Sequence, residues 1–123
     1  MRFLIIDNSP TMRRVLINTL KSFGYSDFVE AEDGKEGLLK LNAEKFDFVI
    51  TDWMLPNMTG IELTKIVRTD DNLKDIPILM ISSRGLKTDI VEALKAKVSN
   101  YMVKPFDPKV LREKIDAILV QIK

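Results

Sequence analysis

The chain has 123 residues, 46% of them apolar, and its 19 lysine and arginine residues against 18 aspartate and glutamate residues give a formal net charge of +1. It has neither cysteine nor histidine, which excludes a disulfide framework, a thiol nucleophile, an ordinary zinc site and an imidazole base. The small net charge gives no reason to expect nucleic acid or a membrane surface as a partner, and the first apolar run is too short for a signal peptide or a membrane span. We expect one cytoplasmic, monomeric domain over residues 1–123.

Short apolar runs alternate with segments of helical period along the whole chain. The predicted strands are residues 3–6, 28–31, 48–50, 76–81 and 100–103. The predicted helices are residues 10–23, segments around 38–41, 63–67 and 90–94, and a last helix that begins at Asp107-Pro108. Runs 3–6, 48–50 and 76–81 are nearly continuous in large apolar residues and predict strands buried on both faces, whereas 28–31 and 100–103 predict edge strands. This alternation is typical of a doubly wound α/β domain with a parallel sheet.

Polar side chains follow four of the predicted strands. Asp7, Asp52, the Ser82-Ser83 pair and Lys104 each stand where a strand ends. Ligands of such sheets bind beyond the carboxyl ends of the strands, so we expect these groups to lie on one edge. Two carboxylates with other oxygen donors suit Mg²⁺, and a lysine can neutralise a phosphoryl oxygen. A carboxylate is ionised at neutral pH and can itself be the nucleophile, forming an aspartyl phosphate without a general base.

The motifs at the strand ends together resemble the receiver domain of response regulators. They are Asp7, the segment 51–60 that contains Asp52, Ser82, and Lys104-Pro105-Phe106. Segments 9–14 and 100–106, with Trp53 beside Asp52, are similar to the single-domain chemotaxis regulators. The resemblance covers essentially the whole chain. It implies a single receiver domain without an output domain, of flavodoxin-like fold, with strand order 2-1-3-4-5 and helices on both faces.

The same resemblance implies a role for individual residues. Asp52 is the phosphoacceptor, and the Mg²⁺ ligands are Asp7, Asn8, Asp52 and the backbone carbonyl of Met54. The phosphoryl-binding and switch residues are Ser82, Ser83, Lys104 and Tyr101. The implied partners are a sensor histidine kinase, the flagellar motor switch protein and a phosphatase, with the target bound by the fourth helix, fifth strand and fifth helix. Such a domain catalyses its own phosphorylation and dephosphorylation but is not a turnover enzyme.

The sequence departs from the receiver pattern at two positions, and two further positions concern the lifetime of the phosphorylated form. Asn8 stands where receivers usually carry a second acid, which predicts weaker Mg²⁺ binding because one ligand charge is lost. Lys97 stands where the family usually has glycine, and a left-handed turn costs lysine more. Met54 and Arg84 flank the path of the attacking water in receivers. Met54 cannot hold a water by hydrogen bonds and Arg84 can lie across the phosphoryl group, so we predict slow self-dephosphorylation.

Two further residues carry expectations, and three other functions stay open. We expect Trp53 at the rim of the site as a fluorescent reporter, and Arg13 on a solvated basic edge of the first helix.

The first alternative function is a single-domain phosphorelay intermediate, and the second is a phosphorylation-independent pseudo-receiver that results from Asn8. The third, a flavin- or nucleotide-binding protein, needs a phosphate-cradling loop, but residues 8–11 contain no glycine and Pro10 removes an amide donor.

Overall fold

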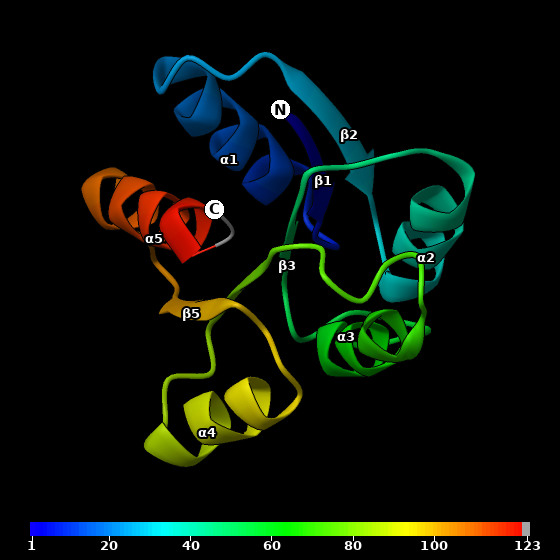
Figure 1. Ribbon diagram of the computed structural model, residues 1–123. Coiled ribbons are helices and arrows are strands. Elements are labelled where there is room, and N and C mark those ends of the chain that lie inside the picture. Colours follow the sequence, from blue (N-terminus) through cyan, green and yellow to red (C-terminus); the bar gives the residue numbers. More distant parts are fainter. Residues whose placement is uncertain (122–123) are drawn as a thin grey trace.

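The computed structural model describes residues 1–121 and contains a five-stranded parallel sheet with helices on both faces (Figure 1). The strands are β1 (Arg2–Ile6), β2 (Asp27–Ala31), β3 (Phe48–Thr51), β4 (Ile78–Ser82) and β5 (Asn100–Val103). The helices are α1 (Pro10–Ser22), α2 (Gly34–Ala43), α3 (Gly60–Thr69), α4 (Lys87–Lys95) and α5 (Pro108–Gln121). The strand order is β2-β1-β3-β4-β5, which confirms the expected order and places the two weaker runs at the edges.

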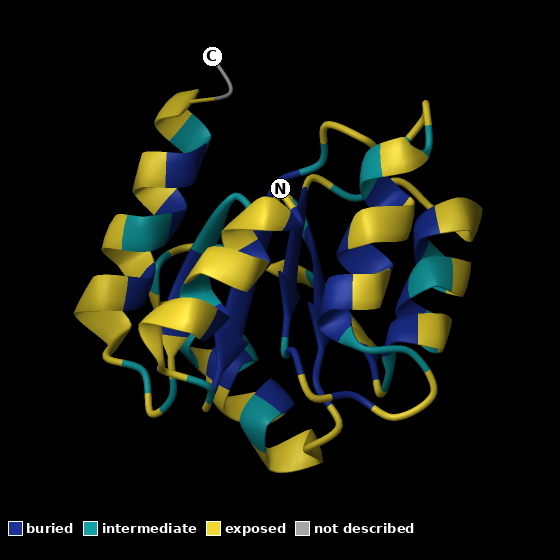
Figure 2. Cartoon of the chain, turned by 90° about the horizontal axis from the view of Figure 1, so that it is seen from below, coloured by how far each residue is buried: buried dark blue, intermediate teal, exposed yellow. Residues whose placement is uncertain are grey.

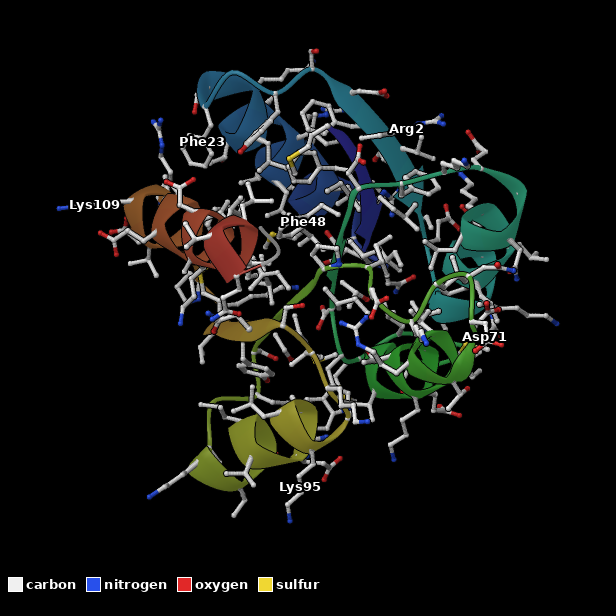
Figure 3. All side chains as sticks on the ribbon, viewed as in Figure 1. Arg2, Phe23, Phe48, Asp71, Lys95 and Lys109 are labelled. Atoms are coloured by element: carbon white, nitrogen blue, oxygen red, sulfur yellow. The ribbon has the colours of Figure 1, made fainter. Side chains whose placement is uncertain are left out.

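The two faces of the sheet carry two separate apolar layers. Successive side chains of a strand point to opposite faces. Phe3 and Ile5 of β1 therefore pack with α1 and α5, and Leu4 and Ile6 pack with α2, α3 and α4. Figure 2 shows the buried residues on the inner sides of the helices and the exposed residues on their outer sides. Phe48 on β3 lies inside the layer under α1 and α5, whereas Lys109 at the start of α5 points outward (Figure 3).

Side-chain caps explain where three helices begin. The Ser9 hydroxyl accepts the Met12 N–H at the start of α1, and the Asp33 carboxylate accepts the Glu36 N–H at the start of α2. Thr59 starts α3 with a reciprocal capping box. None of the helices within residues 1–121 combines the length and the apolar character needed to cross a bilayer.

The fourth strand begins later than the apolar pattern predicts. The run from residue 76 contains Pro77, which has no N–H to give to a sheet ladder. The carbonyl of Pro77 still accepts the N–H of Val49 at 2.9 Å, and β4 itself begins at Ile78. Lys97, which stands where the family usually has glycine, has φ of 76°, so the turn before β5 has the left-handed conformation expected there.

Candidate functional site

Three charged residues follow β1, β3 and β5, and the sheet holds the backbone of each of them. The N–H of Asp7 donates to the last residue of β2 at 3.1 Å, and that of Asp52 to the last residue of β1 at 3.0 Å. The N–H of Lys104 donates to the last residue of β4 at 2.8 Å. Each residue thus extends the hydrogen-bond ladder one step beyond its strand, at the edge where the sequence predicts the site.

The side chains of these residues meet and form an acidic triad of Asp7, Asp52 and Lys104. The Lys104 Nζ lies 2.9 Å from Asp7 Oδ2 and 2.7 Å from Asp52 Oδ2. Burial lowers the pKa of Lys104, but its hydrogen bonds and charge interactions with Asp52 and Asp7 outweigh burial and raise the pKa overall. Lys104 is therefore an ammonium at neutral pH. One ammonium against two carboxylates leaves one negative charge uncompensated, which favours binding of a further cation.

The loop after β3 fixes the second oxygen of Asp52. Asp52 Oδ1 accepts the N–H of Trp53 at 2.6 Å and that of Met54 at 3.3 Å. The loop then folds back, so that the Gly60 N–H donates to the Trp53 carbonyl at 2.9 Å. A Cβ at Gly60 would lie 2.1 Å from the Asp52 carbonyl oxygen, so only glycine fits there. Sequence reasoning gave Gly60 no role of its own, although it closes the 51–60 motif.

The first helix supports Asp7 through a buried arginine. Asp7 Oδ1 accepts the Ser9 N–H at 2.9 Å. Arg13 is only 8% exposed, donates to the Asp7 carbonyl and pairs with the Glu30 carboxylate at 2.8 Å. The expectation of a solvated basic edge is wrong for Arg13, because its long side chain reaches back to the site. The neighbouring Arg14 is exposed, as expected.

The side chains of Ser82 and Tyr101 both form hydrogen bonds with the backbone of Arg84. The buried Ser82 hydroxyl accepts the Arg84 N–H at 3.2 Å, and the Tyr101 hydroxyl donates to the Arg84 carbonyl at 2.6 Å. Burial is the main cause that raises the pKa of Tyr101, so its phenol stays protonated and can donate this bond. The two predicted switch residues thus contact the backbone of the same residue.

Trp53 is buried rather than at the rim. Its exposed fraction is 4%, because the Arg84 guanidinium carbon lies 4.2 Å from the centre of the indole ring. Tyr101 packs against the indole with an edge-on ring at 6.4 Å. The expected rim position of Trp53 is therefore wrong, and the reason is a stacking cation from a distant part of the chain.

The other predicted site residues are exposed or point elsewhere. Asn8, Met54 and Ser83 are exposed, and no hydrogen bond described in residues 1–121 joins the side chain of Asn8 or Ser83 to the acidic triad. The Arg84 guanidinium pairs with Asp89 at 2.8 Å. The Lys104-Pro105 bond is cis.

Asp89 is a residue that sequence reasoning missed. Leu86 precedes α4 and has no side chain that can cap a helix. The Asp89 carboxylate accepts the Leu86 N–H at 3.2 Å instead. An acid in the first turn of a helix after an apolar N-cap is the signal that points to this residue.

The donor set of the acidic triad fits Mg²⁺. Among residues 1–121, no three His, Cys, Asp or Glu side chains are grouped as a metal site, so two carboxylates are the acidic ligands on offer. Mg²⁺ is usually held by one or two carboxylates and keeps several waters or phosphate oxygens as further ligands. Asp7 and Asp52 satisfy this requirement, with the amide of Asn8 next to Asp7 in place of a third carboxylate.

Comparisons with known proteins identify the family of the chain. Residues 3–116 match the family model of the response regulator receiver domain. The chain is 50% identical over 120 residues to the chemotaxis protein CheY1 of Helicobacter pylori, with 97% of each chain covered. It is 43% identical over 122 residues to the chemotaxis protein CheY of Pseudomonas aeruginosa, covering 99% of this chain and 98% of that one. The structure of the chemotaxis response regulator CheY4 of Vibrio cholerae superimposes with a TM-score of 0.87 at 32% identity, covering 95% and 97% of the two chains.

The chain belongs to the response regulator receiver domain family, whose members are signalling switches rather than classical turnover enzymes. Within the family it is a receiver of the CheY type, which acts in two-component signalling in chemotaxis.

Proposed function

We propose that this receiver accepts a phosphoryl group on Asp52 from a sensor histidine kinase and then changes the affinity of its α4-β5-α5 surface for a target protein. The observation that carries the proposal is the acidic triad, in which the Lys104 ammonium lies within 2.9 Å of an oxygen of Asp7 and of Asp52. The absence of histidine is consistent with it, because the kinase supplies the imidazole.

The transfer is a displacement at phosphorus. A carboxylate oxygen of Asp52 forms a bond to phosphorus while the bond from phosphorus to the imidazole nitrogen of the kinase breaks, and the electron pair stays on that nitrogen. The Lys104 ammonium, which already faces Asp52, neutralises a phosphoryl oxygen. The N–H groups of Trp53 and Met54 hold the other carboxylate oxygen and so orient the nucleophile.

Mg²⁺ is the cofactor we propose, with Asp7 and Asp52 as its carboxylate ligands. Asn8 and the backbone carbonyl of Met54 complete the proposed ligand set. When bound, Mg²⁺ neutralises charge on the transferring phosphoryl group. The asparagine amide keeps an oxygen ligand but contributes no charge, so we propose that the site binds Mg²⁺ more weakly than a site with a third carboxylate.

The α4-β5-α5 surface has the character of a docking surface for a protein partner. Its large exposed apolar residues include Leu86, Val91, Leu94, Val103 and Val110. Exposed lysines lie around them, and Lys95 points outward from the end of α4 (Figure 3). Apolar anchors with a basic rim suit an acidic amphipathic segment. We propose the flagellar motor switch protein as this partner.

The decisive experiment measures the phosphoryl group bound to Asp52 and the fluorescence of Trp53, the next residue in the chain. We expect acetyl phosphate with Mg²⁺ to label the protein, and Mg²⁺ followed by beryllofluoride to change Trp53 fluorescence in two steps. Asp52→Asn removes the labelling and the second step. Asp71→Asn, an exposed aspartate away from the site (Figure 3), serves as a matched control and keeps both. Labelling that persists in Asp52→Asn contradicts the proposal.

Binding to a fragment of the proposed partner tests two alternatives, the pseudo-receiver and the phosphorelay intermediate. If the protein is a pseudo-receiver, Asp52→Asn leaves the affinity for a motor-switch fragment and signalling unchanged. If it is a phosphorelay intermediate, the phosphorylated protein passes its phosphoryl group to a second histidine protein and does not bind the fragment more tightly.

The lifetime of the phosphorylated form is a separate part of the proposal. Met54 is 58% exposed beside the acceptor, and the Arg84 Nη1 lies 3.8 Å from its sulfur. Neither the thioether nor the stacked guanidinium supplies a base for a water. We therefore propose slow self-dephosphorylation, and expect Met54→Asn to shorten the lifetime measured by the decay of labelled protein.

A further inference from the structure

Arg84 contacts residues from several parts of the proposed switch. Its backbone N–H donates to the Ser82 hydroxyl, and its carbonyl accepts the Tyr101 hydroxyl. Its guanidinium lies on the indole of Trp53, the residue directly after the acceptor. The same guanidinium donates to Asp89 Oδ1 through Nη2 at 2.8 Å and through Nε at 3.2 Å.

Asp89 connects the Arg84 guanidinium to the start of α4. One of its oxygens binds Arg84, and the other accepts the Leu86 N–H at 3.2 Å at the start of the helix. The Asp89 side chain is 12% exposed, compared with 40% for Arg84, so the pair is not a fully solvated ion pair. A charged hydrogen bond with a partly desolvated acceptor is stronger and more geometrically specific than a surface pair. A shift of the guanidinium therefore acts on the first turn of α4.

We propose that Arg84 is a positioning residue that couples Ser82, beside the acceptor, to the first turn of α4 through its ion pair with Asp89. The proposal rests on the proposed function. A Ser82 hydroxyl that turns to donate to a phosphoryl oxygen on Asp52 moves relative to the Arg84 amide, which follows it or loses its acceptor. The guanidinium on the same residue then moves on Trp53 and carries Asp89 with it. The α4 surface changes because Arg84 links it to the segment beside the acceptor.

The test measures acceptor occupancy and the α4 response separately. The chain has no cysteine, so Leu94→Cys, at an exposed position of α4, introduces a unique site for an environment-sensitive fluorophore. Fluorine NMR of bound beryllofluoride, in the presence of Mg²⁺, reports occupancy at Asp52 without relying on Trp53. We compare the labelled parent with Arg84→Gln, Asp89→Asn, Arg84→Lys and the exposed control Arg14→Gln. Asn at position 89 keeps an oxygen for the Leu86 N–H, so it removes the charge and spares the helix start.

We expect beryllofluoride to bind all variants and the fluorophore to respond fully in the parent and in Arg14→Gln. The response at saturating beryllofluoride falls about fivefold or more in Arg84→Gln and in Asp89→Asn, a loss in the usual range of coupling between sites. Arg84→Lys keeps a larger part of the fluorophore response than Arg84→Gln, since lysine keeps the positive charge that faces Asp89. Full responses in both charge-removing variants overturn the coupling while leaving the proposed function intact. A parent that binds no beryllofluoride overturns the proposed function, and the coupling falls with it.

Discussion

Each of the two ends of the sheet holds a partly buried cationic side chain, and the two side chains have different kinds of partner. At the carboxyl end, Lys104 faces two carboxylates, and these raise its pKa despite burial. At the amino end, Arg68 donates to the carbonyls of Lys97 at 2.8 Å, Lys74 at 2.9 Å and Ile76 at 2.6 Å. Burial lowers the pKa of Arg68, and the charge of Asp75 offsets only part of that effect.

The difference separates a group that exchanges partners from one that does not. The partners of Lys104 are side-chain charges. A phosphoryl group can replace a carboxylate as the partner of the ammonium, and a metal ion can replace the ammonium at the carboxylates. The partners of Arg68 are backbone carbonyls of the α3-β4 and α4-β5 connections, whose positions are given by the path of the chain. We therefore assign chemistry to the carboxyl end and stability to the amino end.

The largest expected effect is on stability at the amino end. Arg68→Met leaves three carbonyls without their charged donor, so we expect the free energy of unfolding to fall by about 3 kcal/mol. Urea unfolding measures this change. Arg14→Met, at an exposed position, is the control and changes it by less than about 0.5 kcal/mol. Below its unfolding transition, the Arg68→Met protein takes up the phosphoryl group at the parent rate, and a large decrease there contradicts the separation of the two ends.

At the carboxyl end, Lys104→Met tests the exchangeable contact. Loss of the ammonium removes a stabilising charge from the phosphoryl group, so we expect uptake from acetyl phosphate to slow about 100-fold, or ~2.7 kcal/mol. Mg²⁺ binding becomes tighter, because the ammonium no longer competes for the two carboxylates. Trp53 fluorescence during a Mg²⁺ titration measures this affinity. Weaker Mg²⁺ binding in Lys104→Met means that Lys104 organises the metal site instead of competing for it.

Asn8→Asp sharpens the comparison by adding charge only to the carboxyl end. A third carboxylate raises the ligand charge, and we expect the dissociation constant for Mg²⁺ to fall about tenfold, or ~1.4 kcal/mol. Asn18→Asp on the exposed side of α1 adds the same charge away from the site and serves as the control. An unchanged Mg²⁺ affinity in Asn8→Asp removes Asn8 from the proposed ligand set.

The smallest effect is expected at the turn that Arg68 holds. Lys97 has a left-handed conformation, which glycine adopts without the steric penalty of a side chain. We expect Lys97→Gly to raise the free energy of unfolding by about 0.5 kcal/mol, since the relieved strain of ~1 kcal/mol exceeds the entropy cost of glycine. Lys65→Gly, at an exposed position inside α3, is the matched control and lowers it by about 1 kcal/mol. Destabilisation by both changes means that the turn is not strained.

The fold and the acidic triad were predictable because they depend on local patterns and one topological rule. Apolar runs and helical periods identify the elements, and parallel strands bring Asp7, Asp52 and Lys104 to one edge whatever their separation in the chain. The strand that starts at Ile78 and not at residue 76 shows the usual limit, because the ladder needs an N–H that Pro77 lacks.

The supporting contacts were not predictable for a different reason. Arg13, Arg68 and Arg84 have long side chains with several donors, and their partners are chosen by packing. Arg68 binds a carbonyl 29 positions away, and nothing in the local sequence names it. The burial of Trp53 follows from the position of Arg84 in the same way. The roles of the site residues rest on the resemblance to receivers and on the proposals above, which the variants described here test.

The extension of the ladder into Asp7, Asp52 and Lys104 has a consequence for motion. The amide protons of these residues are bonded to neighbouring strands, so they should exchange with solvent at rates close to those of the sheet. The backbone of Asp52, the proposed nucleophile, and of its two charged neighbours therefore stays fixed on the timescale on which loops open. In the proposed switch, the rearrangement on phosphorylation is then confined to side chains such as Ser82 and to the segment that begins at Ser83. The rigid residues of the site would carry out the phosphoryl transfer, and the residues that move would transmit it to the partner surface.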